Sequence, residues 1–501
     1  MMCGIAAVSG PQSDGVIQDI LARLGHRGPD GHGVTRIGDI TLGHVRLAIM
    51  DVAGGKQPMF NERADLAIAF NGEIYNHLAL RREIEVRHTF QTRSDTEVLL
   101  HLFEESAEDM LPKLDGMFAV ALAGPGGLLL ARDALGIKPL YYARKGKTLM
   151  AASEIRALPP LDRIHCLPAG HALLPDGREI PFAPHWPPHP HIAEAPLEEI
   201  LPEIRRRLDT AVRKRMMSDV PVGVYLSGGL DSSLIAAAMR PHTVELHSFT
   251  AGMKGAPDLL SAREVARHLG TIHHEALYTE EDVERALPDI IRHLESFDAP
   301  LVRSAIPMYF VSALASKFVK VILSGEGADE LFAGYEYLTQ YESDKELRRE
   351  LNKIVVRLQD TNLQRCDRMT MAHGIEGRVP FLDLDLVRYL ARIPTGHLQT
   401  RTDRPEKWLL REACKGWLPQ RFLMRKKMKF SEGAGSSTLL AHKAAKSISR
   451  REFEDMKHIT PGITLRSPEE AYYYRLWREA MGPHVPPSLV GRTADPKAAA
   501  E

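Results

Sequence analysis

The alternation of apolar and polar positions changes about a third of the way along the chain. Before that point, short apolar runs separated by Gly, Pro, Asn and Asp turns predict strands at residues 40–47, 66–70, 118–122, 127–132 and 140–142. Two helices are expected among them, one at residues 16–24 and one that begins at the N-cap Ser94 and continues through Glu105. This pattern indicates an α+β unit.

A different pattern follows a segment rich in proline and histidine. Residues 183–196 cannot sustain a helix or a central strand, so we interpret residues 179–196 as a linker. Apolar positions at helical spacing from Leu197 to Val212 then predict an amphipathic helix. Strands expected at 222–226, 246–251 and 319–323 are each followed by a helix, which is typical of a doubly wound parallel sheet that binds ligands at the carboxyl ends of its strands.

This pattern predicts two domains, at residues 3–178 and 197–482. Residues 351–481 are expected to be mostly helical, and the Pro- and Ala-rich residues 483–501 are expected to fray.

Composition excludes several classes of protein. Lys and Arg number 64 against 65 Asp and Glu, so the formal charge of -1 does not favour a nucleic acid or an anionic membrane as partner. The apolar runs are shorter than the roughly 20 residues that span a bilayer. The four cysteines lack CxxC spacing, which argues against zinc ribbons and disulfide frameworks. A cytoplasmic protein is expected.

A glycine-rich segment at residues 225–233 reads Tyr-Leu-Ser-Gly-Gly-Leu-Asp-Ser-Ser between an expected strand and an expected helix. Its glycines, serines and helix N-terminus suit a phosphate, and Asp231 in such a loop calls for a bridging divalent cation, which indicates Mg²⁺. A second acidic turn, at residues 324–330, offers Asp329 as another ligand. The alternative is that Asp329 and Glu330 only stabilise the start of a helix.

Polar residues near the start of the chain suit a different chemistry. If no residue preceded Cys3, its α-amine would be a general base beside its own thiol, although a free cysteine is also often a small buried hydrophobe. Asn71 and Gly72 offer donors for an oxyanion. Arg46 suits a carboxylate, and Glu73 with Asp95 an ammonium, as in glutamine. Taken one at a time, each of these residues could also be a surface polar group or a helix cap.

Several motifs resemble a known family. Residues 3–5, 26–30, 71–76, 94–97 and 132–141 resemble a class II glutamine amidotransferase domain with the N-terminal nucleophile (Ntn) hydrolase fold. The two acidic loops resemble the PP-loop ATP pyrophosphatase fold. Joined in this order, and with residues 367–383 also similar, they resemble the glutamine-hydrolysing asparagine synthetase family over most of the chain.

The resemblance implies a fold and two sites. An α+β Ntn hydrolase sandwich would precede an α/β doubly wound, parallel-sheet PP-loop synthetase domain. Cys3 would attack the glutamine amide, with Asn71 and Gly72 as the oxyanion hole. The glutamine pocket would consist of Arg46, Leu47, Ala48, Ile49, Met50, Asn71, Gly72, Glu73 and Asp95.

In the second half the resemblance implies that ATP adenylates a carboxylate, with Mg²⁺ held by Asp231 and Asp329. Glu326 and Lys407 would act at the acyl-adenylate, and ammonia would reach it through an internal tunnel. The ATP site would consist of Leu226, Ser227, Gly228, Gly229, Leu230, Asp231, Ser232, Ser233, Ala251, Ser324 and Gly325.

The expected reaction is amidation of aspartate to asparagine, with release of AMP, diphosphate and glutamate. A tailoring amidotransferase that acts on another carboxylate is the alternative; a phosphoribosyl amidotransferase would not carry the Asp231 loop. The expected partners are small molecules, with a homodimer as the assembly considered. Two features depart from the family: Met1 and Met2 both precede Cys3, and Pro300 and Leu301 replace hydroxyl residues of one branch although Arg303 is retained.

Overall fold

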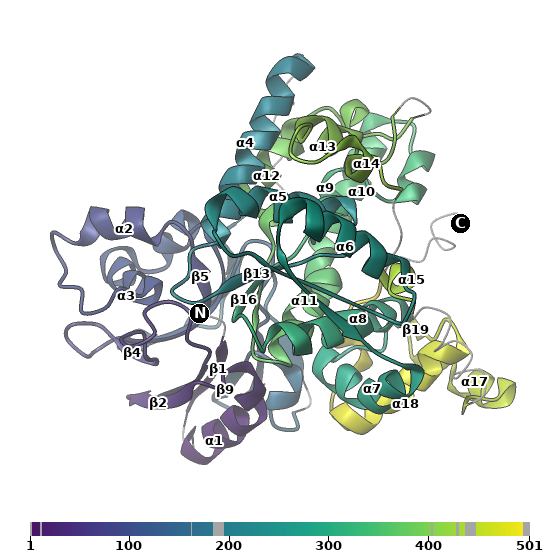
Figure 1. The fold of residues 1–501 in the computed structure, drawn as a ribbon. Helices are drawn as coiled ribbons and strands as arrows, with labels where there is room; N and C mark the ends of the chain where they lie inside the picture. Colours follow the sequence, from purple (N-terminus) through teal and green to yellow (C-terminus); the bar gives the residue numbers. More distant parts are fainter. Residues whose placement is uncertain are drawn as a thin grey trace.

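The computed structural model describes residues 3–10, 13–161, 163–183, 195–401, 404–426, 430–435 and 447–493. These residues form two units that differ in sheet type (Figure 1). The first contains two antiparallel sheets, and the second contains one parallel sheet with helices on both faces. This confirms the expected α+β sandwich followed by a doubly wound α/β domain.

The first unit is a sandwich of two six-stranded sheets. Its strands, in spatial order within each sheet, are β10 (Ile164–Cys166), β8 (Tyr141–Lys145), β9 (Thr148–Ala152), β1 (Cys3–Ser9), β3 (Ile40–Arg46) and β2 (Gly31–Ile37), and then β12 (Glu179–Pro181), β11 (His171–Leu173), β7 (Gly127–Arg132), β6 (Gly116–Gly124), β5 (Ala67–Ile74) and β4 (Met59–Phe60). One apolar cluster, which includes Ile5, Ala69 and Leu130, fills the space between the two sheets. Helix α1 (Ser13–Leu24) packs on the first sheet, and α2 (His77–Ile84) and α3 (Asp95–Ser106) contribute to the cluster on the second.

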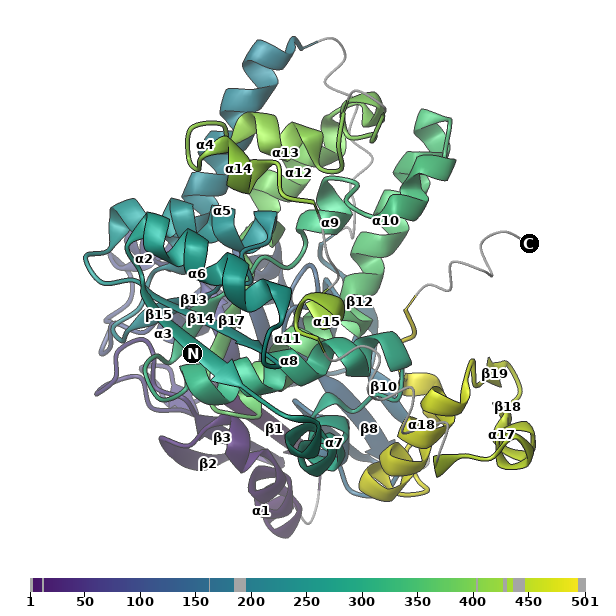
Figure 2. The same ribbon diagram turned by 45° about the vertical axis from the view of Figure 1, so that its right-hand side comes forward.

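The second unit is built on a parallel sheet in the order β15 (Ile272–Leu277), β14 (His247–Gly252), β13 (Val222–Tyr225), β16 (Val321–Leu323) and β17 (Glu376–Arg378). Helices α5 (Leu230–Met239) and α6 (Pro257–Leu269) cover one face, and α8 (Ala299–Ala315) and α11 (Asn362–Met371) the other (Figure 2). The direction of winding therefore changes between β13 and β16. Loops at the carboxyl ends of such neighbouring strands border a ligand crevice.

Further helices surround this core. They are α4 (Leu197–Arg215), α7 (Glu280–Leu294), α9 (Ala328–Leu331), α10 (Asp344–Arg357), α12 (Leu384–Arg392), α13 (Trp408–Ala413), α14 (Gln420–Leu423), α15 (Phe430–Gly433), α17 (Arg450–Met456) and α18 (Pro468–Met481), with the hairpin β18 (His458–Thr460) and β19 (Ile463–Thr464). One continuous apolar cluster runs from β1 and α1 through the parallel sheet to α18. The two units therefore share a core.

Two expected boundaries are wrong. Residues 179–181 form β12, paired with β11, so the first unit extends into the segment interpreted as linker; residues 184–194 lie outside the described residues. Residues 483–493 do not fray, because Val485 and Val490 are buried and Thr493 donates to the buried Asp298 carboxylate. Residues 494–501 lie outside the described residues. No helix in the described part of the chain is long and apolar enough to cross a membrane.

Candidate active sites

Cys3 lies at the start of β1, in the middle of the first sheet, and is fully buried. Its backbone nitrogen donates to Oδ1 of Asn71 at 3.0 Å, and its carbonyl oxygen accepts from Nε of Arg27 at 3.1 Å. Burial raises the pKa of the Cys3 thiol to about 12. The thiol is therefore protonated at neutral pH and needs a base before it can act as a nucleophile.

Asn71 and Gly72 lie together on β5 beside Cys3. The side-chain nitrogen of Asn71 is buried, and no hydrogen-bond partner for it lies among the described residues. At Gly72 a Cβ atom would lie 2.0 Å from the Met117 carbonyl oxygen, so no other residue fits without displacing backbone. A buried donor without a partner is costly unless a ligand uses it, as an oxyanion would.

Arg46 is the register partner of Cys3 on β3. Its two terminal nitrogens donate to the carbonyls of Asp51 and Val52, at 2.8 and 2.9 Å. These bonds fix the guanidinium beside the nucleophile. Residues 47–50, which the sequence assigns to the same pocket, are all buried next to it.

The two carboxylates predicted to hold an ammonium are also buried. Asp95 is in the first turn of α3, where Oδ2 accepts from the backbone of Ile74 at 2.8 Å. Glu73 is on β5, and burial and the nearby Asp95 charge raise the pKa of its carboxyl, to about 8. The structure therefore brings together the sequence-predicted residues Cys3, Arg46, Asn71, Gly72, Glu73 and Asp95.

The second site is a cavity of about 910 Å³ at the carboxyl ends of β13 and β16. Most of the residues predicted to bind ATP line it: Leu226, Ser227, Gly229, Leu230, Asp231, Ser232, Ala251, Ser324 and Gly325. Gly228 and Ser233 are not among the lining residues. Gly228 has φ +71° and packs against the backbone of Ser261, and Ser233 is buried within α5.

The two acidic loops touch each other at this cavity. A Cβ atom on Gly325 would lie 2.9 Å from Cβ of Asp231, which explains why glycine is required there. Asp231 and Asp329 converge on Lys407, whose Nζ lies 2.5 Å from Oδ2 of Asp231 and 2.7 Å from Oδ1 of Asp329. Although burial alone would lower the pKa of Lys407, the two carboxylates raise it above its usual range. Lys407 is therefore a fixed cation at the phosphate loop.

Glu326 also lines the cavity and accepts from Nη2 of Arg365, on α11, at 2.5 Å. Pro300 and Leu301, which depart from one branch of the family, line it together with Arg303. Arg303 is held by Glu469 at the start of α18, with Nε 2.7 Å from Oε1. Arg425 joins this cavity as well and donates to the Ser227 carbonyl at 3.4 Å.

Buried ion pairs join the two units, and sequence reasoning did not find them. Arg27 binds Asp367 of α11 through two hydrogen bonds and also contacts Glu154 at 3.0 Å. Arg378, on β17, lies 3.2 Å from the Glu73 carboxylate. The only sequence signal was the family resemblance of residues 26–30 and 367–383, which carries no information about partners.

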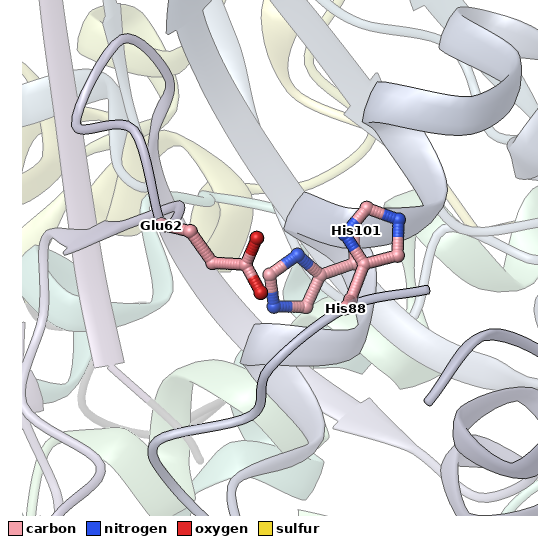
Figure 3. A group of neighbouring side chains, drawn as sticks. All are labelled: Glu62, His88 and His101. Atoms are coloured by element: carbon pink, nitrogen blue, oxygen red, sulfur yellow. The ribbon is translucent and has the colours of Figure 1, made fainter. Parts of the chain in front are cut away.

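A cluster of Glu62, His88 and His101 lies elsewhere in the first unit, with potential ligand atoms within 4.8 Å of one another (Figure 3). The two imidazole rings are stacked, with centroids 4.5 Å apart and planes 27° from parallel, so their in-plane lone pairs do not converge on one point. Glu97 and Glu104 flank His101 and raise its pKa against the effect of burial. We interpret His88 and His101 as members of an ion-pair network with Glu97, Glu104 and Glu105, and not as part of a metal centre.

Family models match both units. A model described as a glutamine amidotransferase domain matches residues 2–173, and one described as asparagine synthase matches residues 203–355 and 338–484. Asparagine synthetase [glutamine-hydrolyzing] 1 of Arabidopsis thaliana is 37% identical over 513 residues, which cover 96% of this chain and 87% of the relative. The corresponding enzymes of Asparagus officinalis and Sandersonia aurantiaca are each 38% identical, over 96% and 97% of this chain and 86% and 97% of theirs.

Proposed function

Because this chain belongs to the glutamine-hydrolysing asparagine synthetase family, we propose that it converts aspartate to asparagine with ATP and glutamine-derived ammonia, and that the two sites described above divide this work. The observation that carries the proposal is the convergence of Asp231, Asp329 and Lys407 at a glycine-rich phosphate loop. It occurs in the same chain as a buried cysteine beside an amide donor that has no hydrogen-bond partner among the described residues.

In the first site, the Cys3 sulfur attacks the side-chain carbonyl carbon of glutamine. The thiol proton passes to the α-amine of Cys3, which requires Cys3 to be the first residue of the mature protein. The Cys3 nitrogen donates to Oδ1 of Asn71 at 3.0 Å, which holds it in place. Nδ2 of Asn71 and the backbone N–H of Gly72 stabilise the oxyanion, ammonia leaves, and water hydrolyses the thioester to glutamate.

The substrate's charged groups meet fixed counter-charges. Arg46, held by two carbonyls, pairs with the α-carboxylate, and Glu73 and Asp95 hold the α-ammonium. Residues 47–50 form the buried wall of this pocket.

In the second site, an oxygen of the aspartate side-chain carboxylate attacks the α-phosphorus of ATP and diphosphate leaves. The helix N-terminus of α5 and the serines of residues 227–233 hold the phosphates. Lys407 neutralises charge on the departing group, and Glu326, positioned by Arg365, supports formation of the acyl-adenylate. Ammonia then attacks the acyl carbon, and AMP leaves.

Asp231 and Asp329 would hold Mg²⁺, because both supply carboxylate oxygens at the phosphate loop, where they also reach the Lys407 ammonium. Mg²⁺ bound there would neutralise the negative charge of the phosphates. A cytoplasmic location is also proposed, because all four cysteines are unpaired. A homodimer stays a prediction that sedimentation can test.

The decisive experiment measures diphosphate release with ATP, Mg²⁺ and a series of carboxylates. Aspartate should drive release and should yield asparagine and AMP in equal amounts when glutamine is present. Release with other carboxylates but not with aspartate would instead favour a tailoring amidotransferase, for which the replacement of hydroxyl residues by Pro300 and Leu301 is the favouring observation.

A further inference from the structure

Arg378 belongs to the parallel sheet of the second unit, yet its side chain reaches the glutamine pocket of the first. It is fully buried on β17. Its Nη2 lies 3.2 Å from Oε1 of Glu73, an ion pair whose geometry falls short of a hydrogen bond. Strand β5 carries Asn71, Gly72 and Glu73, and Glu73 is predicted to bind the ammonium of glutamine. The Arg378 guanidinium therefore faces the ammonium-binding end of the pocket.

The remaining contacts of Arg378 hold its guanidinium in place. Nε donates to Oε1 of Glu376, two residues earlier on β17, at 2.5 Å. Nη1 donates to the carbonyls of Arg215, the last residue of α4, and of Met217 just beyond it, at 2.7 and 2.5 Å. With Nε and Nη1 hydrogen-bonded, the charge next to Glu73 is pre-organised.

The main chain of Arg378 belongs to the other site. It is the register partner of Leu323 on β16, and its carbonyl accepts from the backbone of Ser324 at 2.9 Å. Ser324 and Gly325 line the nucleotide cavity. One residue therefore contacts the glutamine pocket through its side chain and the nucleotide loop through its backbone.

The charges around Glu73 come from three parts of the chain. Burial, with the charges of Asp95 on α3 and Glu376 on β17, raises the pKa of its carboxyl. The amino-terminal charge of the chain and Arg378 oppose this rise, and the net pKa is about 8. A carboxylate that must hold an ammonium has to be ionised when glutamine arrives. Arg378 is a cation that the second unit places beside this carboxylate.

We propose that Arg378 is a positioning residue of the glutamine pocket, which favours the ionised form of Glu73 and fixes its carboxylate in place to hold the α-ammonium of glutamine. This inference rests on the proposed function of Glu73. The glutamine pocket is then complete only when the synthetase unit is packed against it, because the cation comes from β17.

The test compares R378Q and R378K with the unchanged enzyme across pH 6–10. Glutamate release gives KM for glutamine, and asparagine formation with ammonium chloride in place of glutamine reports on the second site. In R378Q we expect KM at pH 7 to rise about 10-fold or more, because an opposite charge at this distance shifts a carboxyl pKa by about 1–3 pH units. The pH at which KM falls should move upward by the same interval. R378K, which keeps the charge without the fork, should recover part of the effect.

E376Q removes a carboxylate near Glu73 and leaves Arg378 in place, so it tests whether charges around Glu73 set the pH dependence of KM. Loss of this neighbouring carboxylate should move the pH dependence of KM for glutamine downward. If R378Q fails to fold, R378K decides the question, because loss of the fork alone should move the pH profile part of the way. The inference is overturned if the pH profile does not move in the Arg378 variants, or if ammonia-dependent synthesis in them falls as much as glutamine use. In the second case Arg378 would only support the Ser324 loop.

E73Q separates this inference from the proposed function. If E73Q leaves KM for glutamine unchanged, the assigned role of Glu73 is wrong and the inference falls with it. If E73Q raises KM while both β17 variants leave it unchanged, the role of Glu73 stands and the role of Arg378 is rejected.

Discussion

Two parallel hydrogen bonds, of 2.9 and 3.1 Å, join the Arg27 guanidinium to the Asp367 carboxylate across the boundary between the glutaminase and synthetase units. Both side chains are buried, and Arg27 also holds the carbonyl of Cys3. Removing one partner of a buried pair leaves an uncompensated charge. This bridge therefore affects both stability and the placement of the nucleophile.

We expect Asp367→Asn to lower the free energy of unfolding by about 3–5 kcal/mol. Asp176→Asn is the matched control, because Asp176 pairs with Arg178 on the surface, where such a pair contributes about 0–1 kcal/mol. Thermal denaturation of both variants measures the difference. Equal denaturation temperatures for the two variants would show that the bridge does not stabilise the enzyme.

The same bridge predicts acid sensitivity. Although burial would raise the pKa of Asp367, the charges of Arg27 and Lys138 lower it below its usual range. A carboxyl with a lowered folded-state pKa contributes stability above its unfolded pKa of about 3.9 and loses it as pH falls through the folded value. Lowering the pH from 5 to 3 should therefore reduce the free energy of unfolding of the unchanged enzyme more than that of the Asp367→Asn variant. Parallel pH profiles would contradict this.

Asn71→Ala should lower kcat for glutamine hydrolysis by about 10²–10³-fold, because it removes one oxyanion donor. Asn76→Ala is a suitable control, since Asn76 follows the same strand but donates to the Lys113 carbonyl at an exposed position. Steady-state glutamate release with each variant tests this. A change in KM alone would place Asn71 in binding and not in stabilising the transition state.

Lys407→Met should abolish most diphosphate release and leave glutamine hydrolysis intact, because the ion pairs that Lys407 makes with described residues are to Asp231 and Asp329 of the nucleotide loops. We expect a loss of about 10²-fold or more for a buried electrostatic group. Lys415→Met, at a mostly exposed lysine paired with Glu412, is the control. If glutamine hydrolysis falls equally, Lys407 supports the whole fold.

Cys3→Ala should abolish glutamine-dependent synthesis and preserve synthesis from ammonia. Cys414→Ala is the control, because burial raises the pKa of that thiol to about 12 as well, yet it lies far along the chain in the synthetase unit. Intact-mass measurement of the purified protein belongs with this experiment. An enzyme that hydrolyses glutamine should begin at Cys3, and activity with Met2 retained would rule out the α-amine as base.

The glycine-rich loops could be predicted because each is a local signal: a strand, a turn with glycines and a helix start lie within ten residues or so. The strand β15 was not predicted, because its His-His-Glu centre at the sheet edge is only half buried and breaks the apolar run. Residues 483–493 were misjudged for a related reason. Val485 and Val490 are spaced without helical or strand periodicity, and only the tertiary packing shows that they are buried.

Some residues of the candidate sites could be predicted from the sequence and others could not. Cys3 and Asn71 could be selected from residue chemistry and family resemblance, and their 3.0 Å contact agrees with that selection. Arg378 could not, because its partner Glu73 lies about 300 residues away in another unit and the pairing depends on how the units pack. The spacing of residues along a chain predicts contacts within an element but not between separately wound units.

The apolar cluster that extends from β1 to α18 has a consequence for how the chain unfolds. Separate cores would melt in two steps, whereas a shared core makes each half expose apolar surface when the other is removed. We expect a single cooperative transition in calorimetry. We also expect the halves, if cut within residues 184–194, to be soluble only when produced together, so that assembly itself would switch on glutamine use.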